Sequence, residues 1–139
     1  MKASKSEKGF SMVELIIVIA IMGIIGAVLV PYYFNASDKA RVTTDVSSMI
    51  AVQNQMEVYL AEFGKEPGSS AEDIIEELVD VGYLKKESVG SNWKLNLQTP
   101  DSEVFFDSAV NEFRLKVKER YYNLCKDNDN VVRWLTKVP

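Results

Sequence analysis

Residues 9–31 read GFSMVELIIVIAIMGIIGAVLVP and contain a long apolar run. Every residue from Leu15 to Val30 is apolar, alanine or glycine, without charge, amide or hydroxyl group. Residues 10–34 make about 25 residues, and at about 1.5 Å per residue a helix of this length crosses a hydrocarbon core of roughly 30 Å. Because backbone groups in lipid must bond internally, we expect residues 10–34 to form one membrane-crossing helix.

Glu14 is the one carboxylate at the edge of this run. A charge at the centre of a membrane helix costs roughly 2.5–3.5 kcal/mol on insertion scales, and such residues usually have a partner. One interpretation is that Glu14 pairs with a cation. The other is that its carboxylate lies at headgroup level and reaches water.

A short basic leader precedes Gly9 and Phe10, Glu14 follows four residues later, and Pro31 ends the apolar run. This arrangement resembles the N-terminal signature of type IV pilins and of the pseudopilins of type II secretion, closely over about the first 35 residues. The resemblance implies that a prepilin peptidase removes residues 1–9 by cutting between Gly9 and Phe10. It also implies N-methylation of Phe10 and contact between Glu14 and the Phe10 amine of a neighbouring subunit during assembly.

Cleavage would create an ammonium on Phe10, four residues from Glu14. The two groups can meet within one helix, or between subunits when a neighbour arrives. In the second case, removing one partner would leave a buried charge uncompensated, at roughly 3–5 kcal/mol. Charge pairing would then set the register of assembly.

Composition restricts the remaining possibilities. The chain has 139 residues and a net charge of −4, and the leader carries +2, so cleavage would leave −6. An acidic mature chain argues against nucleic-acid binding. The sequence has no histidine, and its single cysteine, Cys125, excludes an intramolecular disulfide, which departs from many type IV pilins. Lysines at positions 2, 5 and 8 predict a cytoplasmic N-terminus and an outward-facing C-terminal region. The resemblance implies that the chain lies first in the inner membrane and then in a periplasmic or extracellular filament.

Gly23, Gly26 and Pro31 interrupt the apolar segment. Glycine costs about 1 kcal/mol in a helix interior, and proline removes a hydrogen bond. Two compatible interpretations remain open. The helix can kink or partly melt here when packed in a filament, or the small residues let neighbouring helices approach.

Residues 35–63 are expected to continue as an amphipathic helix that underlies a globular head, residues 64–139. Its apolar positions recur at helical spacing: Val42, Val46, Met49, Met56, Leu60 and Phe63, broadened by Ile50, Val52 and Tyr59. Asp38 and Asp45 are placed on other faces. Gly64 is expected to end this helix.

In the head, Ser70 is expected to cap a helix that Gly82 closes. The period then changes to two, which predicts strands at 93–97, 104–106 and 113–117, and a last strand at 131–138. Residues 121–126 fit a helix or a strand. The predicted fold is α+β and pilin-like: a long N-terminal helix packed on a small antiparallel sheet.

Two features of the head were weighed for binding. Arg114, Lys116, Lys118 and Arg120 form either a basic ladder for an acidic partner or a solvated sheet face. The stretch Asp127-Asn128-Asp129-Asn130 offers oxygen ligands, so Asp127 and Asp129 form either a candidate calcium site or a polar turn. Cys125 is expected to be packed and inert.

The prediction is a structural subunit, not an enzyme, of a type IV pilus or pilus-like filament. The resemblance implies that it polymerises with itself or other pilins, aided by a prepilin peptidase, an assembly ATPase and a membrane platform protein. The alternatives are a type II secretion pseudopilin, and an uncleaved single-pass anchor that presents a binding head.

Overall fold

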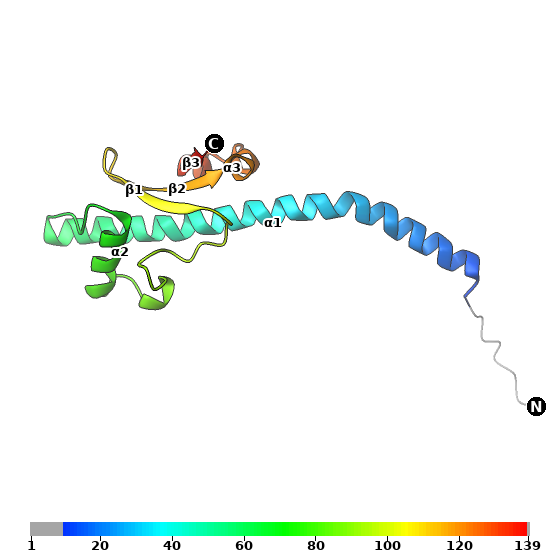
Figure 1. Cartoon of the computed structure of the whole chain (residues 1–139), viewed down its shortest axis with the longest axis horizontal. Coiled ribbons are helices and arrows are strands. Elements are labelled where there is room, and N and C mark those ends of the chain that lie inside the picture. Colours follow the sequence, from blue (N-terminus) through cyan, green and yellow to red (C-terminus); the bar gives the residue numbers. More distant parts are fainter. Residues whose placement is uncertain (1–9, 139) are drawn as a thin grey trace, which may run out of the picture. The chain divides into compact units, whose positions relative to one another are not determined.

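The computed structural model describes residues 10–138, which divide into two compact units between Ala36 and Ser37. Helix α1 (Met12–Phe63) supplies the whole of the first unit apart from Phe10 and Ser11 (Figure 1). Among the described residues, α1 is the one helix long and apolar enough to cross a membrane, and none of the side chains in its most apolar stretch is buried. The two units are described separately.

The second unit places a small sheet and short helices on the second half of α1 (Figure 1). After α1 come helix α2 (Ala71–Asp80) and the 3₁₀ turn η1 (Lys86–Ser88). Strands β1 (Glu103–Asp107) and β2 (Glu112–Lys118) follow. Helices α3 (Glu119–Cys125) and α4 (Asp129–Val132) lead to strand β3 (Leu135–Val138). The predicted α+β class and pilin-like layout are confirmed.

The sheet has the order β1-β2-β3 and is mixed, which corrects the expectation of an antiparallel sheet. β1 pairs antiparallel with β2, with Phe105 opposite Arg114, whereas β2 pairs parallel with β3, with Leu115 opposite Leu135. A parallel pair needs a crossover connection, and α3 and α4 supply it. Strand β3 is shorter than the predicted last strand because Val131 belongs to α4.

The predicted strand at 93–97 is wrong. This segment is a loop with one isolated bridge, between Val89 and Leu95. Its alternation arises because Trp93, Leu95 and Leu97 are half-buried while the residues between them are exposed. The backbone amides at the end of the segment bond to a side chain of α1, so the loop is held without a strand partner.

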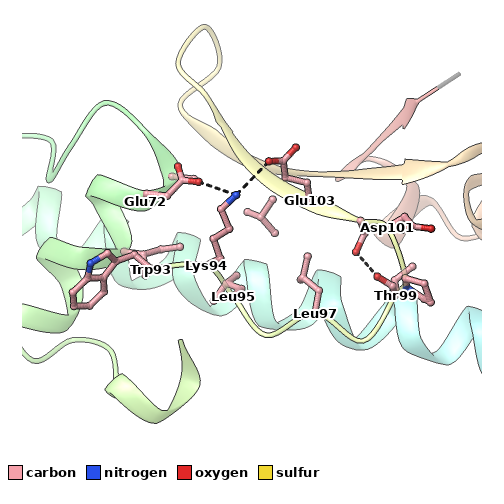
Figure 2. A pocket seen from close by; sticks show the side chains of 13 residues that line it. Glu72, Trp93, Lys94, Leu95, Leu97, Thr99, Asp101 and Glu103 are labelled. Atoms are coloured by element: carbon pink, nitrogen blue, oxygen red, sulfur yellow. Dashed lines mark hydrogen bonds and ion pairs between the residues drawn. The ribbon is translucent and has the colours of Figure 1, made fainter. Parts of the chain in front are cut away.

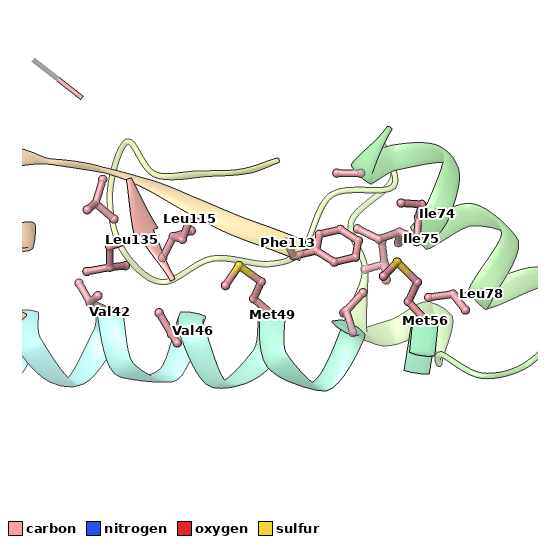
Figure 3. Packing of buried hydrophobic residues seen from close by; sticks show 14 of the residues in the cluster. Val42, Val46, Met49, Met56, Ile74, Ile75, Leu78, Phe113, Leu115 and Leu135 are labelled. Atoms are coloured by element: carbon pink, nitrogen blue, oxygen red, sulfur yellow. The ribbon is translucent and has the colours of Figure 1, made fainter. Parts of the chain in front are cut away.

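The core lies between the second half of α1, helix α2 and strand β2 (Figure 3). Figure 3 shows Met49 of α1 below Phe113 and Leu115 of β2, and Met56 beside Leu78 of α2. All five side chains are at most 1% exposed. The helical spacing predicted most of this stripe correctly. The error is Phe63, which is 48% exposed and stacks on Tyr59 with 4.5 Å between ring centroids.

Three polar residues of α1 also face the core, which corrects the placement of Asp38 and Asp45 on other faces. Asp45 accepts hydrogen bonds of 2.8 Å from the backbone N–H groups of Gln98 and Thr99. Gln53 accepts from the N–H of Phe113 at 3.0 Å and donates to the carbonyl of Asn111 at 3.2 Å. Burial of these groups is tolerated because each is hydrogen-bonded.

The third of these residues is Asp38, whose Oδ2 accepts a hydrogen bond of 2.8 Å from Arg120 Nη2 of α3. The polar side chains therefore attach the loop, the sheet and α3 to α1.

The helix ends follow the predicted signals. The Ser70 hydroxyl accepts a hydrogen bond from the N–H of Asp73 at 3.2 Å and so caps α2. Gly64, with φ +65°, follows the last residue of α1, and Gly82, with φ +91°, follows α2. Glycine adopts this left-handed conformation without steric cost. Residues 121–125, left open between helix and strand, belong to α3.

Candidate assembly segment

The first unit exposes an apolar helix surface that no other element of this unit covers. Its large apolar side chains are between 43% and 81% exposed, from Phe10 through Phe34. Exposed apolar patches of this size mark interaction with a membrane or another protein. The segment predicted from the apolar run therefore has the surface that such a role requires.

Helix α1 begins with a reciprocal capping arrangement that the sequence analysis missed. The Ser11 hydroxyl accepts a hydrogen bond from the N–H of Val13 at 3.3 Å, and the N–H of Ser11 donates to Glu14 Oε2 at 2.9 Å. This resembles a capping box, with the hydroxyl bonded two rather than three residues on, and the sequence signal is a serine or threonine followed three residues later by Glu or Gln. The residues Ser11-Met12-Val13-Glu14 carried that signal in front of the apolar run.

The capping box places the Glu14 carboxylate at the first turn of α1, where it also interacts favourably with the positive end of the helix dipole. Among residues 10–138, Glu14 makes no ion pair within 4.0 Å. Its second carboxylate oxygen, Oε1, makes no hydrogen bond in the described part of the chain. Chemically, Glu14 can hold its own helix start and accept a cation at the same time. Gly9 lies outside the described residues, and Phe10 is 81% exposed.

Gly23, Gly26 and Pro31 all lie within continuous α1. A Cβ added at Gly23 or Gly26 would meet nothing within 4 Å. Neither glycine is therefore required by packing within this unit. Pro31 lacks an N–H, so it cannot donate to the carbonyl four residues before it. A role for these residues in kinking or in helix–helix approach stays a prediction.

The proposed basic ladder does not form as a free cationic face. Arg114 lies 3.6 Å from a Glu112 oxygen and 3.9 Å from an Asp107 oxygen. Lys118 Nζ lies 2.6 Å from Asp101 Oδ2, and hydrogen bonding to that carboxylate raises the pKa of Lys118. Arg120 belongs to α3 and pairs with Asp38. Three of the four cations are paired with carboxylates, which favours the solvated-face interpretation.

The candidate calcium residues lie beside α4. Asp127 is in the turn before α4 and Asp129 is its first residue, and both are exposed. No group of three or more acidic, histidine or cysteine side chains in residues 10–138 is placed to hold a metal ion. Calcium binding stays a prediction.

Cys125 is fully buried and free, as predicted for an inert side chain. Burial raises the pKa of its thiol. The reactive thiolate is therefore disfavoured.

Comparison with known proteins supports the N-terminal signature. A family model described as "Prokaryotic N-terminal methylation motif" matches residues 4–30. The chain is 33% identical over 99 residues to a fimbrial protein of Pseudomonas aeruginosa, covering 71% of this chain and 63% of the relative. It is 30% identical over 59 residues to the type II secretion system core protein G of Escherichia coli K12, covering 42% of this chain and 41% of the relative.

A fimbrial protein of Neisseria meningitidis serogroup B is 23% identical over 134 residues, which cover 96% of this chain and 74% of the relative. No solved structure matches. The match to the Pseudomonas protein spans less than two thirds of that protein's length. The resemblance to pilins and pseudopilins that the N-terminal residues suggested is confirmed.

Proposed function

We propose that this chain is a structural subunit of a type IV pilus or pilus-like filament, and that it polymerises through the first half of α1. The observation that carries this proposal is the exposed apolar first half of α1, a helix that begins at Met12 and has Glu14 in its first turn. The methylation motif and the fimbrial homologues support it. In the proposed sequence of events, prepilin peptidase cuts between Gly9 and Phe10, and the new Phe10 amine is methylated.

Before assembly, the helix crosses the inner membrane with its N-terminus in the cytoplasm, and the head lies outside. An assembly ATPase and a membrane platform protein then drive extraction into the filament. Within the filament, Glu14 pairs with the Phe10 amine of a neighbouring copy or of another pilin. On extraction from lipid, contacts with neighbouring helices replace the lipid contacts of the apolar side chains and keep these side chains out of water.

Three substitutions separate charge pairing from capping. Glu14→Gln keeps an oxygen that can accept from the N–H of Ser11, but it has no charge to offer an ammonium. Glu14→Val removes both the acceptor oxygen and the negative charge. Ser11→Ala removes the capping hydroxyl and keeps the charge of Glu14. Charge pairing predicts that both Glu14 variants abolish filaments while Ser11→Ala retains them. Glu76→Gln, an exposed change in α2, is the matched control.

The readouts are electron microscopy of filaments and mass spectrometry of the N-terminus in cells. Assembly of normal filaments by Glu14→Gln would contradict charge pairing. A mature chain that begins at methylated Phe10 supports processing. An intact Met1 on a chain that never associates would instead support the single-pass anchor.

The second candidate within the same class is a type II secretion pseudopilin, which the similarity to core protein G favours. The free Cys125, which leaves the head without a disulfide, also fits this class. Deleting the gene distinguishes the two: loss of surface filaments indicates a pilin, and loss of protein secretion indicates a pseudopilin.

For Asp127 and Asp129, a rise in melting temperature with millimolar calcium, absent from Asp127→Asn, would support a metal site.

A further inference from the structure

The second unit contains a cavity of about 470 Å³ between the start of α2 and residues 93–104 (Figure 2). This volume lies within the roughly 300–1,000 Å³ typical of small-molecule sites. Ile75, Leu95, Leu97 and Val104 provide apolar walls. Three carboxylates, Glu72, Asp101 and Glu103, and one cation, Lys94, also line it. The cavity thus combines an apolar interior with an acidic rim.

Lys94 already places an ammonium between two of these carboxylates. Its Nζ lies 3.6 Å from Glu72 Oε1 and 3.6 Å from Glu103 Oε1 (Figure 2). Both distances exceed the roughly 2.7–2.9 Å of a tight charge-assisted hydrogen bond. All three side chains are also 42–56% exposed, and exposed pairs of this kind contribute little to stability. Lys94 is therefore a weakly held occupant that another ammonium can displace at low cost.

The charges around the cavity favour a cation. Asp101 is paired outside the cavity with Lys118 at 2.6 Å. Glu72 and Glu103 are left to share the single ammonium of Lys94. One negative charge therefore remains uncompensated at this point of the rim, which attracts cations and disfavours anions.

Thr99 adds a polar group inside the cavity wall. It is 3% exposed, and its hydroxyl oxygen is buried without a hydrogen-bond partner in the described residues. Its backbone N–H is fixed to Asp45 at 2.8 Å, so the residue is held in place. A buried hydroxyl without a partner is destabilising, and each such group requires an explanation. The hydroxyl oxygen has less than 1 Å² of accessible surface, so rotation of this side chain toward the cavity would let a polar atom of a bound molecule supply the missing partner.

The loop that forms the cavity is also conformationally strained. Trp93 has φ of +56°, a left-handed conformation that is unfavourable for a bulky side chain, and Asp101 has the same φ, which aspartate tolerates more readily. Both residues line the cavity. Strained residues concentrate at binding and catalytic sites, where surrounding structure holds them in place.

We propose that this cavity binds a primary ammonium carried on an apolar stem, which replaces Lys94 between Glu72 and Glu103. The stem occupies the apolar interior, and a polar atom of the ligand bonds the Thr99 hydroxyl. Two sources share this chemistry: a free small amine, and a lysine side chain from a second copy of the chain. The second source rests on the proposed filament, and the first does not.

The probe for the test is 6-amino-1-hexanol, which carries an ammonium, an apolar stem and a terminal hydroxyl. The full chain is placed in lipid nanodiscs at one copy per disc, and the nuclear magnetic resonance shifts of the Thr99 amide and the Trp93 indole are followed. We expect saturable binding of the probe. Hexanol lacks the cation and 6-hydroxyhexanoate replaces it with an anion, so we expect both to bind at least about tenfold more weakly.

Neighbouring substitutions should act in opposite directions. Lys94→Met keeps the stem and removes the competing ammonium, so it should strengthen probe binding by about threefold or more. Glu72→Gln with Glu103→Gln should weaken it by about tenfold. Thr99→Val should weaken binding by about fivefold while raising the melting temperature, because it removes a buried unpaired hydroxyl. Glu119→Gln, in the ion pair with Lys137, is the control and should leave binding unchanged.

Equal binding of all three compounds, or weaker probe binding by Lys94→Met, would overturn the proposal. Absence of any saturable shift in Lys94→Met would do so as well. The source of the ammonium is assigned in assembled filaments: a neighbour's lysine would block the probe there, whereas a free-amine site would stay open. Because the nanodisc measurements use single copies, they decide on the cavity even where the chain forms no filaments.

Discussion

The two halves of α1 differ in how their apolar side chains are shielded from water. From Ser37 to Phe63 the helix buries a stripe of apolar side chains under its own sheet and α2. From Met12 to Ala36 the side chains are apolar on all sides and almost all exposed. A helix that is hydrophobic all round needs a membrane or partner helices. The difference shows that the chain completes one half of its helix by itself and leaves the other half to its surroundings.

The largest expected effect compares one methionine in each half. Met49→Ala removes a fully buried side chain and should lower the free energy of unfolding of the second unit by about 2–5 kcal/mol. Met22 is 68% exposed, so Met22→Ala should leave that free energy within about 0.5 kcal/mol of its original value. Urea unfolding followed by circular dichroism measures both. Equal losses in the two variants would show that the halves are not distinct in the way described.

A second prediction concerns the polar attachment of the loop to α1. Asp45→Ala leaves the N–H groups of Gln98 and Thr99 buried without an acceptor, which should cost about 2–4 kcal/mol. Asp45→Asn keeps one acceptor oxygen and should cost about half as much. Hydrogen exchange of these two amides gives a direct readout. Unchanged protection in Asp45→Ala would mean that the carboxylate does not hold the loop.

A third comparison uses one glycine from each half. Gly64 has φ of +65°, so Gly64→Ala should destabilise the second unit by about 1 kcal/mol. Gly23 is helical with open space around it, so Gly23→Ala should leave the second unit unchanged and favour the helix. If Gly23→Ala nevertheless prevents filament formation, close approach between helices is the role of that glycine. Thermal unfolding and electron microscopy separate the two effects.

The smallest expected effect is a pH dependence of the second unit. The Tyr59 hydroxyl donates to Glu77 at 2.8 Å, and this hydrogen bond raises the pKa of Tyr59 above its usual value near 10. Because the folded pKa is the higher one, this contribution to stability is complete below pH 10 and is lost as the pH rises through the folded pKa. Glu77→Gln should lower the Tyr59 pKa, measured by ultraviolet titration. An unchanged titration curve would exclude the hydrogen bond as its cause.

Much of this arrangement was predictable because single local signals determine it. The unbroken run from Leu15 to Val30 indicated an exposed apolar helix, and the spacing of Val42, Val46 and Met49 indicated the buried stripe. Gly64 and Gly82 marked helix ends through the conformation that they alone adopt easily. In each case one short stretch of sequence contains the whole physical cause.

The errors arose where distant residues decide the outcome. The alternation at 93–97 predicted a strand, but its neighbour turned out to be the carboxylate of Asp45, about 50 residues earlier, rather than another strand. Asp38 and Asp45 share the face of Val42 by spacing, yet their charge suggested solvent. The parallel pairing of β3 depends on the path of α3 and α4, which periodicity does not encode. The capping box at Ser11 was readable from the sequence and was overlooked.

Asp45 holds the loop by accepting hydrogen bonds from the main-chain N–H groups of residues 98 and 99. Every amino acid except proline has such an N–H group. These hydrogen bonds place no demand on the side chain of Gln98, which is exposed, whereas the side chain of Thr99 is also constrained by its burial. Gln98 can therefore be exchanged for any residue except proline while Asp45 still holds the loop. The sequence at this exposed position is free to vary because Asp45 bonds only to the backbone there.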